Sequence, residues 1–257
     1  MELLVAGNGF IGSALEERLE DHDVDTLGLE DADIEQDVTE EFELEKSYDV
    51  LFHCIGLAPG FNSPEEYQEV HVDGTRNLLD AVQADKVVYL SALGTGENDY
   101  SFFHTKRQAE SLVRDRADRW TIIRPSTVYG PGNQLLEMIR SFSLTRMFPR
   151  IPAETQPIHI DDLAELLEIS IDGLGQETVN AAGPEPVTIS RMAKKIYREE
   201  GRRCMVIPVP LPVTRAMMRL MDPLPVPFGK ELLPVLEMSN TTDENHAADH
   251  LELTKIF

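Results

Sequence analysis

The chain has little of several features that define common protein classes. It holds only two cysteines, Cys54 and Cys204, with no CxxC pair and no Cys/His cluster. We therefore expect no disulfide framework and no metal site. Its most apolar region, Val206 to Phe228, is interrupted by six prolines and two arginines. Because a spanning helix needs about 20 apolar residues, we expect no membrane span. The N-terminus enters a strand-like segment at once, so we expect no signal peptide.

Basic residues are also scarce. The sequence has 23 Lys and Arg against 46 Asp and Glu, a net charge of −23. Such a charge repels nucleic acid and anionic lipid, so neither is expected as a partner. At about 1 M salt the Debye length falls to ~3 Å, and the self-repulsion of the chain is screened. The acids are spread along the chain, which favours a halophile's protein in a high-salt cytoplasm over an ordinary acidic protein.

What the sequence does have is an alternation of strand-like and helix-like segments across 257 residues, 42% of them hydrophobic. This order predicts an α/β fold, a doubly wound parallel sheet. The strands are expected at Glu2–Ala6, Val24–Leu29, Val50–Ile55, Lys86–Ser91, Trp120–Arg124, Pro157–Ile160 and Thr178–Ala181. The helices are expected at Ile11–Glu20, His71–Gln83, Ser101–Arg116, Gln134–Ser143 and Leu163–Ile171.

The sequence pattern changes at Pro184. We predict two parts, a nucleotide-binding domain over residues 1–183 and a small C-terminal lobe over 184–257. In the lobe, helices are expected at Arg191–Glu200, Val213–Met221 and Lys230–Leu236. Met217, Met218 and Met221 would lie near the mouth of a pocket. They suit either core packing or a surface for an apolar ligand or partner.

The segment LLVAGNGFIGSALEERL carries the strongest local signal. An apolar strand runs through Gly7, Gly9 and Gly12 into an amphipathic helix. That order is typical of a dinucleotide site, where glycines admit a pyrophosphate and the helix N-terminus favours its charge. Phe10 and Ile11 would add backbone contacts in the first helical turn. Asp37, followed by Val38, comes after the second strand, where its carboxylate could accept from an adenine amino group or simply form a solvated turn.

Further motifs follow in a fixed order: QDVTE, VLFHCIGLAP, HVDGTRNLLDA, VVYLSALGTG, TIIRPSTVYGPG, PIHIDDLA and NAAGPEPVTI. Together they resemble the extended and atypical short-chain dehydrogenases/reductases, which are NAD-dependent epimerase/dehydratase-like proteins. The pairing of SALG with RPSTVYG resembles the atypical branch that includes the nucleotide-binding accessory subunit of respiratory complex I. The resemblance implies a Rossmann fold that binds NAD or NADP. It also shows a departure, since the extended family reads GxxGxxG and the first glycine here becomes Ala6.

The resemblance implies further cofactor contacts along the expected strand ends. Glu30, at the end of the second strand, would repel a 2′-phosphate and so favours NAD over NADP. The stretch Ile55–Leu57 would line the adenine-ribose and pyrophosphate side, and Ser91 would lie near the nicotinamide. The residues implied in this way are Glu30, Ile55, Gly56, Leu57, Ser91, Lys106, Pro125, Ser126 and Val128.

The catalytic set departs further from the family. The family uses a tyrosine four residues before a lysine, which places both on one helix face. Here Lys106 is present, but position 102 is phenylalanine, which transfers no proton. Leu93 stands where the epimerases carry a second hydroxyl. Tyr100 is an alternative acid if the chain bends inward.

Three histidines stand inside the family's motifs. We expect His53, His71 and His159 to be hydrogen-bonded structural histidines and not bases.

Two classes of function therefore remain. One is a dinucleotide-binding protein whose cofactor is structural or serves non-standard redox chemistry, either as a homodimer or beside a redox complex. The other is an active oxidoreductase, or a nucleotide-sugar epimerase or dehydratase, with another proton donor. The sequence identifies no small-molecule substrate and leaves open whether the protein is an enzyme.

Overall fold

The computed structural model describes residues 1–96, 100–209, 238–255 and 257. The expected helices Val213–Met221 and Lys230–Leu236, with Met217, Met218 and Met221, lie outside these ranges.

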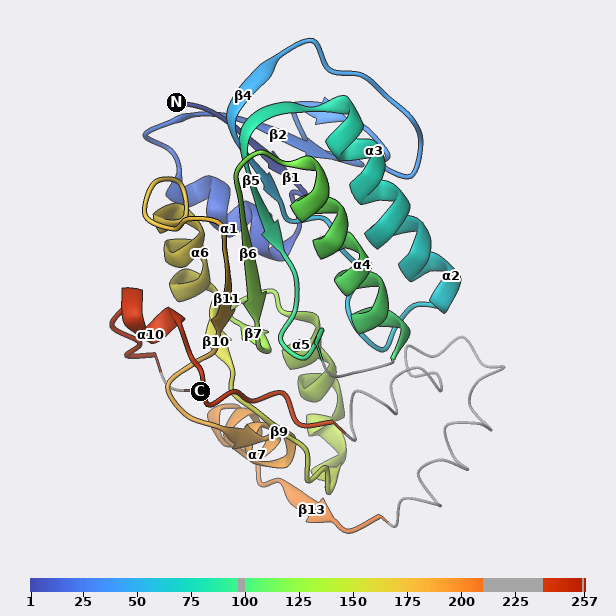
Figure 1. Cartoon of the computed structure of the whole chain (residues 1–257). Helices are drawn as coiled ribbons and strands as arrows, with labels where there is room; N and C mark the ends of the chain where they lie inside the picture. The colour runs from blue at the N-terminus through green and yellow to red at the C-terminus, as the bar shows by residue number, and fades with distance from the viewer. Residues whose placement is uncertain (97–99, 210–237, 256) are drawn as a thin grey trace.

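The fold is organised by one sheet of seven parallel strands in the order β11-β6-β5-β4-β1-β2-β3. The order reverses direction at β1, and ligands of such sheets bind at this switch point, beyond the carboxyl ends of the strands. The doubly wound α/β prediction is thus confirmed (Figure 1). The strands are β1 (Glu2–Ala6), β2 (Asp23–Gly28), β3 (Ile34–Glu35), β4 (Ser47–His53), β5 (Gln83–Leu90), β6 (Trp120–Pro125) and β11 (Glu177–Ala181).

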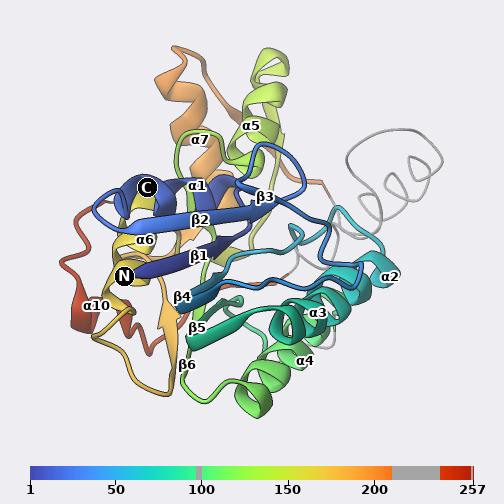
Figure 2. The ribbon, with the colours of Figure 1, turned by 90° about the horizontal axis from the view of Figure 1, so that it is seen from above.

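Helices cover both faces of the sheet (Figure 2). On one face lie α1 (Phe10–Arg18) and α6 (Ile160–Ile169), where Leu15 and Leu163 are fully buried. On the other lie α2 (Pro64–Tyr67), the π-helical η1 (Gln68–Asp73), α3 (Gly74–Ala81) and α4 (Ser101–Arg116). Because apolar side chains of the strands alternate between these two cores, both faces of the sheet are dry.

Two element predictions differ from the structure. The helix expected at His71–Gln83 begins seven residues earlier, because Ser63 and Glu66 form a reciprocal capping box with Pro64 in the first turn. The strand expected at Pro157–Ile160 is outside the main sheet. It forms β10 (Ile158–His159), which pairs only with β7 (Val128–Tyr129).

A second, smaller core lies beyond the carboxyl ends of the main strands. Phe148, Ile139, Met192 and Tyr197 are buried in it. Its elements are α5 (Gln134–Ser141), η2 (Phe142–Thr145), β8 (Met147–Pro149), β9 (Glu154–Thr155), β12 (Val187–Thr188), α7 (Ile189–Glu199) and β13 (Met205–Ile207). The lobe therefore takes chain from before Pro184, while Ala247 of α10 (Ala247–His250) packs back against the main core. The division at residue 183 stays a prediction.

A buried carboxylate joins α4 to the sheet. Glu110 has no exposed surface, and its two oxygens accept from Arg124 Nε and Nη2, both at 2.7 Å. Arg114 Nη2 and the hydroxyls of Ser91 and Thr95 also donate to it, at 3.0, 2.6 and 3.3 Å. Burial alone would raise the pKa of the Glu110 carboxyl, but these donors outweigh it and hold the pKa below its usual value.

We expect Glu110→Gln to lower the free energy of unfolding by about 3 kcal/mol, because it leaves two guanidinium groups without their anion. Denaturant titration measures the loss. The matched control is Glu137→Gln, whose exposed pair with Arg140 should contribute less than about 1 kcal/mol. Equal losses in the two variants would show that the buried network has no special role.

Candidate functional site

The glycine turn lies where β1, β2 and β4 end side by side. Gly7 has φ +106°, and its N–H donates to Leu27 O at 2.7 Å. A Cβ atom at Gly7 would lie 2.9 Å from Ile55 N, and one at Gly12 would lie 1.7 Å from Gly7 O. Both positions therefore exclude a side chain. The chain needs glycine here to bring α1 against the strand ends.

The N-terminus of α1 has the features of an anion site. Gly9 is its N-cap, no side chain caps it, and its first turn holds no acidic residue. A Cβ at Gly9 would have nothing within 4 Å, so the space above the turn is open. The helix dipole and the N–H groups of Phe10 and Ile11 suit a diphosphate there. The residues present thus fit the dinucleotide that the sequence motifs imply.

The end of β2 is shaped by a residue that the sequence analysis did not single out. Asn8 Nδ2 donates to Glu30 O at 2.7 Å and to Asp31 O at 3.1 Å. The Asn8 amide also fills the space beside Gly28, where a Cβ would lie 2.2 Å from Asn8 Oδ1. The exposed side chains of Glu30 and Asp31 leave this corner acidic.

Asp37 and Val38 follow β3 in a local turn. Asp37 Oδ1 accepts from Thr39 N and Thr39 Oγ1 at 2.9 and 2.8 Å. Val38 is buried against Gly74 of α3. The carboxylate is thus engaged in its own turn, which favours the solvated-turn alternative for Asp37.

Lys106 reaches the switch point from α4. Its ammonium group donates to Leu90 O at 2.9 Å and lies 5.0 Å from the centre of the Tyr89 ring. A Cβ at Gly56, between Ile55 and Leu57, would lie 2.8 Å from Lys106 Nζ. Burial lowers the pKa of Lys106 to about 8. The structure therefore brings Lys106 to the segment after β4 that is predicted to line the cofactor.

Phe102 occupies the helix position where the family carries its proton donor. It is buried, with its ring 5.6 Å from Tyr67, 5.4 Å from His71 and 5.0 Å from Phe103 between centroids. Leu93 is also buried. An apolar and aromatic cluster therefore stands where two polar catalytic groups would be expected.

Tyr100 is the N-cap of α4, in an extended backbone conformation. Its hydroxyl accepts from Gly60 N at 3.1 Å and lies 3.5 Å from the Tyr67 hydroxyl. Tyr67 itself donates to Ala58 O at 2.9 Å. The two phenols thus hold the loop after β4, and the catalytic role of Tyr100 stays a prediction.

The hydroxyl groups predicted near the nicotinamide have partners inside the protein. Ser91 donates to Glu110, as described above. Ser126 Oγ donates to Asn240 O at 2.8 Å, tying the end of β6 to the C-terminal segment. Pro125 ends β6 and is buried, while Val128 is half-buried in β7. All of these lie at or just after the ends of β5 and β6, and their contact with a cofactor stays a prediction.

His53 and His71 are buried and hydrogen-bonded within the protein, as expected. His71 Nε2 accepts from Leu57 N at 3.0 Å, which assigns the proton to Nδ1 facing Thr105 Oγ1 at 2.9 Å. His53 Nε2 lies 2.8 Å from Thr75 Oγ1. Burial, reinforced by the charge of Lys106, lowers the pKa of His53 to about 3 and of His71 to about 2. His159 accepts from Asp161 N and caps α6.

Sequence reasoning missed four residues of the site: Asn8, Tyr67, Glu110 and Asn240. Tyr67 and Glu110 carried usable signals. Tyr67 follows the SPEE capping box, and Glu110 lies one helical turn after Lys106 on the same face. The partners of Asn8 and Asn240 are distant in the sequence and left no local pattern.

No group of three or more His, Cys, Asp or Glu in the described ranges could hold a metal ion. Across the same residues, no helix is both long enough and apolar enough to cross a bilayer.

We expect stability to fall as the pH drops below about 6.5, the usual pKa of an unfolded histidine. Between that pH and about 3 the unfolded chain binds protons that folded His53 and His71 do not, so stability rises with pH. His53→Asn should reduce the slope by about 1.4 kcal/mol per pH unit near pH 5. Thermal or urea unfolding at stepped pH measures it, with exposed His250→Gln as control. An unchanged slope in His53→Asn would contradict the burial of a neutral imidazole.

Comparison with known proteins agrees with this geometry. A model of the NAD dependent epimerase/dehydratase family matches residues 3–182. The chain is 27% identical over 169 residues to the mitochondrial NADH-ubiquinone oxidoreductase 40 kDa subunit of Neurospora crassa, a match that covers 63% of this chain and 44% of that protein. The chain matches less than half the length of its curated relatives.

Solved structures share the fold. The UDP-glucose 4-epimerase of Thermus thermophilus, in complex with NAD, has a TM-score of 0.72 at 19% identity, covering 100% of this chain and 95% of that one. The dTDP-4-dehydrorhamnose reductase of Bacillus anthracis str. Ames, in complex with NADP, has a TM-score of 0.68 at 18% identity, covering 82% and 84%. The resemblance to short-chain dehydrogenases/reductases is thereby confirmed, and the chain belongs to the NAD dependent epimerase/dehydratase family.

Proposed function

We propose that the protein binds NAD or NADP at the switch point between β1 and β4 but lacks the family's standard proton-transfer pair. One observation carries the proposal. Phe102, four residues before Lys106, is packed among aromatic rings, while Lys106 keeps its buried place beside Gly56. The cofactor is then structural, or it serves redox chemistry of a non-standard kind.

The binding half of the proposal rests on the open space above Gly9 and the uncapped N-terminus of α1. These would hold the diphosphate, and Lys106 would donate to ribose hydroxyls. A bound nicotinamide supplies hydride chemistry. The carboxylates of Glu30 and Asp31 disfavour a 2′-phosphate, so we infer a preference for NAD.

The partners and the cellular location of the protein are proposed from its similarity to a known subunit and from its net charge. Its relation to the complex I 40 kDa subunit supports association with a redox complex, and a homodimer is the alternative. The net charge of −23 supports a high-salt cytoplasm.

A second candidate is an active oxidoreductase, or a nucleotide-sugar epimerase or dehydratase. The phenols of Tyr67 and Tyr100, 3.5 Å apart at the loop after β4, favour it as replacement proton donors. Among the solved structures of this fold, one is a complex with NAD and another a complex with NADP, so both dinucleotides remain candidate cofactors for this chain.

The binding half is tested at Gly9. Gly9 has an extended backbone conformation (φ −78°, ψ −163°) that alanine also adopts, and a Cβ there would enter open space. Gly9→Ala should therefore leave the fold unchanged, while its methyl group in the diphosphate space lowers dinucleotide affinity at least tenfold. Fluorescence titration with NADH and NADPH in molar salt measures the affinity. The matched control is Gly175→Ala, because a Cβ at Gly175 would also have nothing within 4 Å. Gly175 precedes the edge strand β11, away from the glycine turn, so this variant should bind dinucleotide normally. Failure of the wild-type chain to bind either dinucleotide refutes the proposal.

The chemical half is tested by turnover. We expect bound NADH to stay reduced when nucleotide sugars and small carbonyl compounds are offered, because reduction of a carbonyl needs a proton donor and no phenol stands at position 102. The absorbance of the reduced nicotinamide follows the reaction. If turnover occurs, Tyr100→Phe is compared with Tyr129→Phe, whose hydroxyl instead donates to Lys255 O. A rate lost only in Tyr100→Phe would establish the active alternative.

A further inference from the structure

The end of the small lobe gathers exposed apolar side chains. Leu144, Met147 and Met205 are 77%, 46% and 61% exposed, and they are three of the six exposed large apolar residues in the described chain. Met147 of β8 and Met205 of β13 are direct partners in the strand register. We call η2, β8 and β13 the lobe tip. Figure 1 shows β13 at the extremity of the molecule, far from the amino ends of the main strands.

The lobe tip and the adjoining α7 are also basic, against the trend of the chain. Residues 141–150 and 189–207 hold eight Lys and Arg against two Glu, whereas the rest of the chain holds 15 against 44. On α7, Arg191, Lys194, Lys195 and Arg198 follow the i, i+3, i+4, i+7 spacing of one helix face, opposite the buried face. Arg146, Arg150 and Arg203 are exposed on the tip itself.

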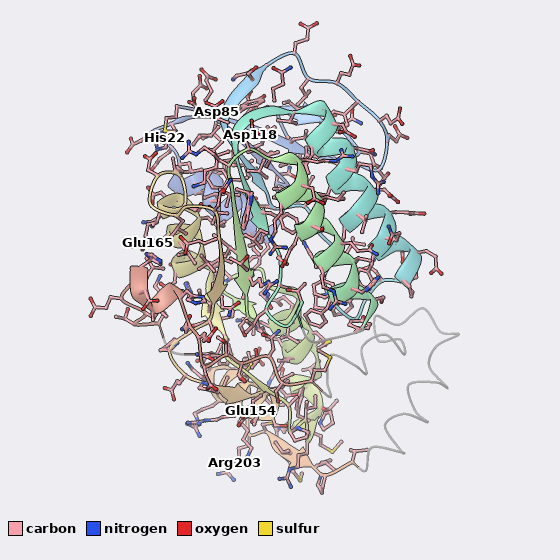
Figure 3. All side chains as sticks on the ribbon, viewed as in Figure 1. His22, Asp85, Asp118, Glu154, Glu165 and Arg203 are labelled. Carbon is pink, nitrogen blue, oxygen red and sulfur yellow. The ribbon has the colours of Figure 1, made fainter. Side chains whose placement is uncertain are left out.

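The basic helix face and the apolar tip belong to one surface region. The Tyr197 hydroxyl of α7 donates to Met147 O at 3.3 Å, and Met205 N donates to Arg146 O at 2.8 Å. Figure 3 places Arg203 at this extremity, with Asp85 and Asp118 at the opposite end of the molecule. The β1 strand alone spans about 17 Å, so the acidic end lies beyond the ~10 Å Debye length at 0.1 M salt.

We propose that the lobe tip is a peripheral binding surface for anionic lipid bilayers. Leu144, Met147 and Met205 would enter the headgroup region, and the surrounding Arg and Lys would contact lipid phosphates. The net charge of the whole chain argues against anionic lipid, but it averages over a molecule whose two ends differ in sign. This inference is independent of the proposed cofactor.

A lipid surface fits the tip better than an acidic protein does. A stable protein interface buries roughly 800 Å² on each partner and is centred on side chains that fill well-packed pockets. The tip instead offers three flexible aliphatic side chains on a projecting extremity with a basic surround. That arrangement is typical of interfacial membrane contacts.

The test is co-sedimentation of the full chain with two kinds of vesicle. At 0.1 M KCl, with folding verified by circular dichroism, we expect binding to vesicles of phosphatidylcholine with phosphatidylglycerol and at least tenfold weaker binding to phosphatidylcholine alone. Leu144→Ser with Met205→Ser should weaken binding at least tenfold. Lys194→Glu with Arg203→Glu should do the same. Arg116→Glu with Arg119→Glu makes the same charge change at the amino edge of the sheet and should leave binding unchanged.

Three results would overturn the proposal. One is the absence of preferential binding to anionic vesicles by the folded wild-type chain. Another is equal loss in the tip and control charge variants. The third is binding to soluble polyglutamate that is as tight as to vesicles and unaffected by Leu144→Ser with Met205→Ser, which would assign the tip to an acidic polypeptide. NADH titration of the same variants keeps this test separate from the cofactor proposal, because the tip substitutions should leave dinucleotide affinity unchanged.

Discussion

The site depends on a close backbone approach centred on Gly7. Its N–H bonds to the last carbonyl but one of β2, and its α-carbon faces the backbone after β4. Gly12 of α1 packs against the carbonyl oxygen of Gly7, where a Cβ at position 12 would clash with it. A side chain at either glycine would force apart the elements that border the switch point. Because these two positions are bare, the helix N-terminus is delivered to the crevice between β1 and β4, and every other site residue is placed relative to it.

The two functional halves of the site are supported in different ways. The half that would bind a dinucleotide is made mainly of backbone: an uncapped helix end, open space at Gly9 and the loop at Gly56 after β4. The half that would move a proton depends on individual side chains, and two of the positions expected to carry polar groups hold the buried Leu93 and Phe102. Lys106 links the two, held by Leu90 O and the Tyr89 ring. Backbone sites survive substitution more readily than catalytic side chains do, so binding without the standard chemistry is a physically consistent outcome.

Most strands, the glycine turn and the place of Lys106 could be predicted because their signals are local: apolar runs, glycine spacing and helix period. The capping box at Ser63 is an equally local signal, and the helix that it caps begins seven residues before the expected start. The partners of Ser91 could not be predicted in this way. Its hydroxyl meets Glu110, 19 residues on, and Glu110 in turn meets Arg124. The i, i+4 spacing from Lys106 places Glu110 on the same helix face, but its pairing with Ser91 and Arg124 depends on how α4 docks on the sheet.

The net charge of the sequence likewise does not predict how the charges are distributed over the folded molecule. The excess of acid in the sequence correctly describes the average surface, but folding sorts the charges in space. The carboxyl ends of the strands lie between an acidic end and a basic lobe tip. An anion approaching from solution therefore meets less repulsion at the lobe end than at the acidic end. Since the small lobe borders the crevice where the dinucleotide would lie, the same polarity favours contact of the protein with an anionic surface through the lobe, with the acidic end turned away.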